Sequence, residues 1–146
     1  MKGLRAWSTG MLLGLATLPA LAQERPYTDG PVVVVSSIKV VDGQFENYMS
    51  WLSGNWRRSQ EAAKKAGFVT DYHVYSAEAH NPQEPDLYLV VSYPNMAALD
   101  GMNEKMDPIM AQVMKMDYKQ ADEASGKRTV MRTLYGQETL RELLFK

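Results

Sequence analysis

The pattern of apolar and polar residues predicts four strands. Residues 32–41 open with four consecutive valines, a β-branched run typical of a strand that is covered on both faces. Three further segments rich in tyrosine, valine and leucine also have strand-like patterns: residues 68–77, 87–93 and 129–135. A loop containing two prolines separates the second segment from the third, so we expect these two strands to be antiparallel neighbours.

Two other segments have the three-to-four-residue spacing of amphipathic helices. Residues 45–66 have an apolar face that begins at Phe45, and the glycine that follows them is typical of a helix end. The second helical region starts after Asn95, a favourable N-cap residue. Asp107-Pro108 interrupts this region, which predicts either two short helices or one kinked helix. The tail, residues 138–146, fits a helix or an edge strand equally well.

The resulting order is β-α-β-β-α-β, which predicts a ferredoxin-like α+β fold. In this fold a four-stranded antiparallel sheet carries both helices on one face. Residues 32–146 then form a single domain that includes the tail. Residues 23–31 are polar and punctuated by proline and glycine, so we expect a flexible lead-in.

This element order, with a valine-rich first strand and an aromatic first helix, resembles the dimeric α+β-barrel superfamily over residues 31–136. The superfamily includes antibiotic-biosynthesis-monooxygenase-like and haem-degrading proteins. The resemblance implies a homodimer in which two helix-free sheet faces close a barrel around a pocket. The residues support the same expectation, because Val33 and Val35 make the second face of the first strand apolar and the helices cover only one face.

The second helical region departs from the haem-degrading members of that superfamily. Those proteins carry an axial histidine on their second helix, whereas residues 96–125 contain no histidine. We therefore expect no haem and no other cofactor. The cofactor-free oxygenases of the superfamily need only a pocket with tyrosine, tryptophan or arginine side chains, so an enzyme of that kind stays open.

The first 22 residues have the features of a cleaved signal peptide. Lys2 and Arg5 precede an apolar run at residues 11–18, and Ala20-Leu21-Ala22 offers a small-x-small cleavage site. This run is shorter than the ~20 residues of a membrane-spanning helix. We expect cleavage after Ala22, export to the periplasm and no membrane anchor.

Composition removes several classes of protein. The 146-residue chain has no cysteine and 16 basic against 17 acidic residues, for a net charge of −1. Disulfide scaffolds are therefore excluded, and no basic patch indicates nucleic-acid binding. The sequence contains no nucleophile elbow, glycine-rich phosphate loop or zincin helix.

Two sets of residues are candidates for chemistry. The first could line a barrel pocket and consists of His73, Tyr75, Tyr88 and Arg132. The second is a methionine row with a four-residue spacing: Met102, Met106, Met110 and Met114. Thioether sulfur is a ligand for Cu(I), although methionine at such spacing is also an ordinary filler of cores.

These observations favour an exported homodimer that binds a small apolar or aromatic molecule in a dimer pocket. Three alternatives stay open. The first is a cofactor-free monooxygenase-like or isomerase-like enzyme that uses the first set of residues. The second is a periplasmic copper-handling protein that uses the methionine row, and the third is a structural or interaction protein.

Overall fold

The structure, a computed structural model, describes residues 24–146, so the expected signal peptide lies outside the described residues. The elements are β1 (Tyr27–Val40), α1 (Phe45–Trp51), η1 (Leu52–Trp56), α2 (Arg57–Lys65), β2 (Asp71–Ser76), β3 (Leu87–Tyr93), η2 (Met96–Leu99), α3 (Met102–Met114), α4 (Tyr118–Lys127), η3 (Arg128–Val130) and β4 (Arg132–Phe145). None of the helices in this part of the chain is long and apolar enough to cross a bilayer.

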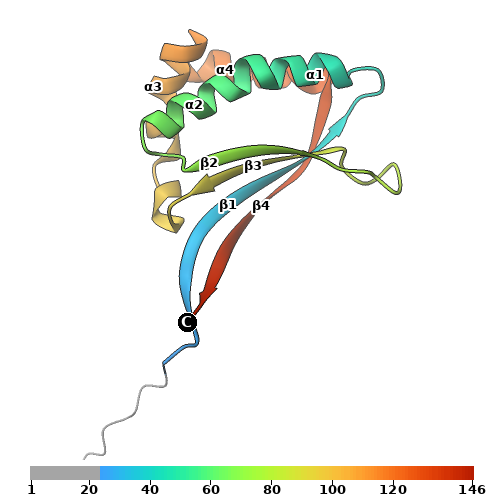
Figure 1. Cartoon of the computed structure of the whole chain (residues 1–146). Coiled ribbons are helices and arrows are strands. Elements are labelled where there is room, and N and C mark those ends of the chain that lie inside the picture. The colour runs from blue at the N-terminus through green and yellow to red at the C-terminus, as the bar shows by residue number, and fades with distance from the viewer. Residues whose placement is uncertain (1–23) are drawn as a thin grey trace, which may run out of the picture.

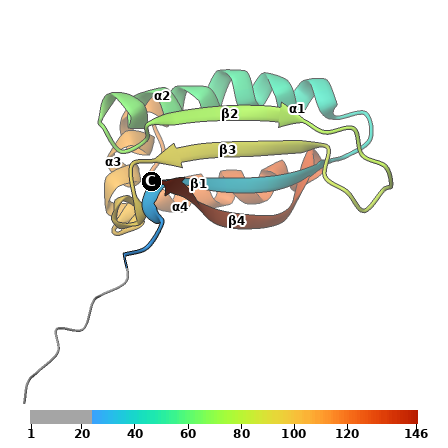
Figure 2. The same cartoon turned by 60° about the horizontal axis from the view of Figure 1, so that its bottom comes forward.

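The four strands form one antiparallel sheet in the order β2-β3-β1-β4. Figures 1 and 2 show α1, α2, α3 and α4 together on one face of this sheet, while no helix of residues 24–146 covers the opposite face. This arrangement confirms the predicted ferredoxin-like α+β fold.

The core lies between the sheet and the helices. One cluster joins Ile38, Val40, Leu87 and Leu89 of the sheet to Tyr48 and Leu52 of the first helical segment. A second cluster consists of Ala63, Val69 and Ile109. Because side chains alternate along a strand, the even-numbered positions of β1 from Val32 to Val40 face the helix side, and the odd-numbered positions from Val33 to Lys39 face the helix-free side.

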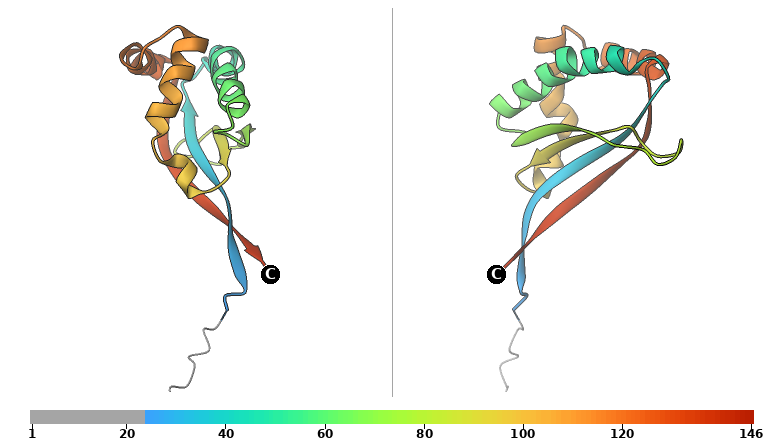
Figure 3. Two further views of the ribbon diagram at one scale, coloured as in Figure 1. Left: turned by 90° about the vertical axis from the view of Figure 1, so that its left-hand side faces the viewer. Right: turned by 45° about the vertical axis from the view of Figure 1, so that its right-hand side comes forward.

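Strands β1 and β4 are both longer than the sequence pattern predicts. β1 begins at Tyr27, so most of the expected flexible lead-in belongs to a strand, and the ambiguous tail is the outer part of β4. The two additions pair with each other, with Tyr27 opposite Phe145. Figure 3 shows this two-stranded arm extending away from the helices. Each addition gives the other the hydrogen-bonding partner that it lacks alone, and local sequence patterns do not report such distant pairing.

The second helical region breaks at a different point from the predicted one. α3 continues through Pro108, and the break comes at Lys115, whose φ of 57° is left-handed. α4 then starts from a capping box, in which the Asp117 side chain accepts from the Gln120 backbone N–H while the Gln120 side chain accepts from the Asp117 N–H. This reciprocal pair satisfies two N–H groups at the new helix start, which makes residues 115–117 the favourable place for a break.

The long β2–β3 loop is fixed to β1 by Asp86. Its carboxylate accepts hydrogen bonds from Lys39 Nζ and from the Val40 backbone N–H, both at 2.8 Å. Burial raises the pKa of the Asp86 carboxyl, but these hydrogen bonds outweigh burial and hold that pKa below its ordinary value. The carboxylate is therefore favoured in the folded state.

Replacing Asp86 with Asn is expected to lower the free energy of unfolding at neutral pH, and the loss should depend on pH. Because the pKa is lowered in the folded state, the stabilisation is present above about pH 4, the ordinary range of an aspartate, and is lost as the pH falls through the lower folded value. Urea unfolding at pH 6 and pH 3 measures the difference between D86N and the natural chain. The loss of unfolding free energy in D86N should be larger at pH 6 than at pH 3. The control D122N, at an exposed position of α4, should have the same unfolding free energy as the natural chain at both pH values.

Candidate functional site

Three of the four predicted pocket residues lie together on the helix-free face of the sheet. Tyr75 of β2 is directly opposite Tyr88 of β3, and His73 is opposite Val90. The rings of His73 and Tyr75 are 5.7 Å apart between centroids. Val35 lies on the far side of Val90, so an apolar strip runs across the middle of this face. We call the residues Val33, Val35, His73, Tyr75, Tyr88 and Val90 the open-face cluster.

Arg132 does not join the open-face cluster, which corrects the predicted grouping. It is paired with Val40, a core position, and its charge acts on the Tyr48 hydroxyl beneath the helices. A β-bulge is the cause, because β1 passes from Ser37 to Ile38 while β4 passes from Gly136 to Leu134. The extra residue reverses the alternation of side chains along the rest of β4 and moves Arg132 to the helix side. Within one chain, Arg132 therefore lies on the other face of the sheet from His73, Tyr75 and Tyr88.

A cavity of about 240 Å³ lies within the helical layer, between η1, α3 and α4. η1 is a π-helical turn, in which hydrogen bonds join residues five apart and bring such residues into line. Trp51 and Trp56 are five apart, and both line this cavity. Within residues 24–146, no atom lies near enough to Gly54 of this turn to require a glycine there.

Not all methionines of the predicted row line this cavity. Met106, Met110 and Met114 line the cavity together with Met116, whereas Met102, at the start of α3, does not. Met106 also packs against the cluster around Ile109, as expected for a methionine that fills a core. We call this space, with its two tryptophans and four methionines, the Trp–Met cavity.

Arg128 is the charged residue of the Trp–Met cavity, and no local sequence pattern marks it as a site residue. Its guanidinium lies 4.2 Å from the centre of the Trp51 ring. Its Nε atom is buried and has no hydrogen-bond partner within residues 24–146, and no carboxylate in that range forms an ion pair with Arg128. Burial lowers the pKa of Arg128, and the positive charge of Arg132 lowers it further. This site therefore holds a cation without a compensating anion.

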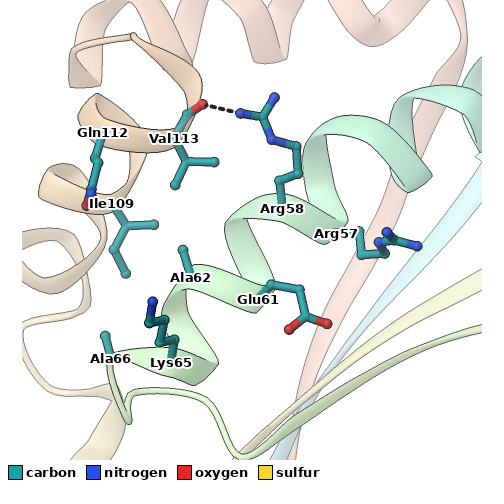
Figure 4. Close-up of a pocket in the computed structure, with 9 residues that line it drawn as sticks. All are labelled: Arg57, Arg58, Glu61, Ala62, Lys65, Ala66, Ile109, Gln112 and Val113. Carbon is teal, nitrogen blue, oxygen red and sulfur yellow. Dashed lines mark hydrogen bonds between the residues drawn. The ribbon is translucent and has the colours of Figure 1, made fainter.

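A larger and more open groove of about 630 Å³ separates α2 from α3 (Figure 4). Its sides carry Arg57, Arg58 and Lys65 from α2 and Ile109 and Val113 from α3. Arg58 crosses the groove and donates a 3.1 Å hydrogen bond to the Val113 carbonyl near the end of α3. This contact satisfies a carbonyl that the helix end leaves open, so Arg58 has a structural role.

The two histidines lie on different elements and are close to different carboxylates. His73 Nε2 is 3.3 Å from Asp71 on β2, and His80, in the exposed β2–β3 loop, has Nδ1 3.3 Å from Glu84. Within residues 24–146, no three His, Cys, Asp or Glu side chains gather as they do around a bound metal.

Comparison with known proteins gives structural likenesses and no likeness in sequence. No family model matches the chain, and no curated protein matches its sequence. The crystal structure of HapK from Hahella chejuensis aligns with a TM-score of 0.50 and 13% identity, over 76% of this chain and 91% of HapK. Protein SO0527 from Shewanella oneidensis aligns with a TM-score of 0.50 and 15% identity, over 81% of this chain and 96% of SO0527.

A third solved structure, described as a dimeric ferredoxin-like protein from an uncultured marine organism, has a TM-score of 0.46 and 8% identity, over 82% of this chain and 90% of that one. At that score it adds nothing to the first two likenesses. HapK and SO0527 match nearly their whole length, so the chain shares the ferredoxin-like α+β fold with them.

Proposed function

We propose that this chain is an exported homodimeric α+β-barrel protein that binds a small apolar or aromatic molecule between two sheets. The observation that carries the proposal is the apolar, helix-free face of the sheet, with the open-face cluster at its centre. A second copy of the chain is the partner that fits, because two such faces can cover one another about a two-fold axis.

The composition of this face also favours a ligand between the two sheets. Val33, Val35 and Val90 supply apolar walls, while His73 and the two tyrosines bring ring nitrogens and hydroxyl groups to the same surface. Small-molecule sites combine mostly apolar walls with a few polar groups that orient the ligand. Tyr75 keeps 53% of its surface exposed in the single chain, so its ring is available for such a contact.

The dimer is tested by placing a carboxylate in the open-face cluster. The natural chain at micromolar concentration should have twice the mass of one chain by size-exclusion chromatography with light scattering. Val90→Asp should have the mass of one chain, because dimerisation would bury its carboxylate without a partner. Val130→Asp is the matched control, since Val130 is 69% exposed in η3 and lies outside the open-face cluster. A monomeric natural chain, or a dimeric Val90→Asp, contradicts the dimer.

Ligand binding is tested with the neutral, apolar dye N-phenyl-1-naphthylamine, whose fluorescence rises in apolar surroundings. We expect saturable binding to the natural chain and at least about tenfold weaker binding to Val90→Asp. In the monomer, the sheet face that would form the dimer pocket is open to water. Val130→Asp should bind the dye like the natural chain. Equal dye binding by Val90→Asp would show that the ligand does not need the dimer chamber.

Export is tested separately by expression in a bacterium with two membranes. The full chain should be recovered from the periplasmic fraction with a mass reduced by residues 1–22 and with Gln23 at its N-terminus. Ala20→Lys with Ala22→Lys, which removes the small residues at the cleavage site, should leave the leader attached. Recovery of the full-length natural chain from the cytoplasm would contradict the proposed export.

A further inference from the structure

The Trp–Met cavity lies on the opposite side of the sheet from the open-face cluster, so it would be a second binding space that does not depend on the proposed dimer chamber. The residues around it differ in character from those of the open face. Its walls consist mainly of two indole rings and four thioether side chains, and its charged lining residue is Arg128.

The charge of the cavity favours an anion over a metal cation. The methionine sulfurs alone would suit Cu(I). However, the Arg128 guanidinium lines the same space, and within the described part of the chain no acidic side chain lines the cavity to offset it. A bound cation would therefore be repelled, whereas an anion would be attracted to the guanidinium and could accept hydrogen bonds from it.

The size and the walls restrict that anion to a small molecule with an apolar body. An apolar cavity of about 150 Å³ is enough to hold benzene, so about 240 Å³ accommodates one ring with a carboxylate and a small substituent. Trp51 and Trp56 give the cavity aromatic walls, and methionine sulfur makes favourable contacts with aromatic rings. The amides of Asn55 and Gln60 also line the cavity and can bind a further polar substituent.

We propose that the Trp–Met cavity binds a small monocyclic carboxylate. The carboxylate pairs with Arg128, and the ring packs between the indoles of Trp51 and Trp56 and the methionines of α3. Among residues 24–146, Arg128 is the one charged side chain that lines the cavity, which favours a monocarboxylate over phosphate esters with two charges.

The two tryptophans of the cavity provide a direct readout. The chain has three tryptophans, and the third is Trp7 in the expected leader. With Trp7→Phe, the tryptophan emission of the full chain comes from Trp51 and Trp56. Titration with benzoate, phenylacetate, 4-hydroxybenzoate and cyclohexanecarboxylate should give saturable changes in this emission, and calorimetry checks each affinity. Acetate tests the charge without the ring, and benzyl alcohol tests the ring without the charge; both should bind at least about tenfold more weakly than the best carboxylate.

Variants of the arginine separate binding from structure. Arg128→Gln should weaken carboxylate binding at least about tenfold and leave the weak binding of benzyl alcohol unchanged, because only the carboxylate uses the guanidinium. Arg128→Lys keeps the charge and loses the planar fork, so its affinity should fall between the two. Arg57→Gln, an exposed arginine at the start of α2, is the control and should bind like the natural chain. If circular dichroism shows that Arg128→Gln is unfolded, Arg128→Lys and the comparison with benzyl alcohol decide the question.

Three outcomes would overturn the proposal. The first is that no carboxylate of the panel binds at concentrations up to about 10 mM. The second is that Arg128→Gln folds and binds carboxylates like the natural chain. The third is that Ag⁺, used as a stable substitute for Cu(I), quenches the emission where carboxylates do not, and that Met110→Leu with Met114→Leu abolishes this quenching. Val90→Asp should keep carboxylate binding, so failure of the dimer chamber and failure of this cavity give different results.

Discussion

The structure depends on one constraint, which is that the central strand β1 is apolar on both faces while residues 24–146 supply helices for only one. The even-numbered positions, such as Val32 and Ile38, are buried under the helices with 0% and 2% of their surface exposed. The odd-numbered positions, such as Val33 and Val35, stay partly exposed on the other side. Covering that second face is worth roughly 25 cal/mol for each Å² of apolar surface, a gain that a second molecule can supply. The proposed dimer follows directly from this imbalance.

The fold was largely accessible from the sequence because its elements have clear periods. The four consecutive valines, the helical spacing after Phe45 and the loop prolines between β2 and β3 are local signals, and each predicted element exists. What local signals did not give was pairing over long distances. The outer parts of β1 and β4 are strands because they pair with each other, with Thr28 opposite Leu144, and neither segment has a strong strand pattern of its own.

The candidate sites were less accessible, because each depends on a local irregularity of the backbone. One extra residue in β4 moves Arg132 from the face of His73 and Tyr75 to the face of the helices. One π-helical turn places Trp51 and Trp56 on the same cavity, although five residues separate them. Neither irregularity has a reliable sequence signature, since both are selected by packing across the whole domain. Arg128 was missed for the same reason, because its importance lies in what surrounds it and not in its neighbours along the chain.

The π-helical turn also bears on how relatives of this chain should be aligned. A turn with hydrogen bonds between residues five apart accommodates one residue more than an α-helical turn while the helix on each side continues in place. The surplus is presented outward, at the exposed Ser53 and Gly54. A relative with a regular α-helix would therefore be one residue shorter here, with its two aromatic residues four apart and still facing the same cavity. In an alignment the corresponding gap belongs inside this helix, at residues 53–54, rather than in the loops where gaps are usually placed.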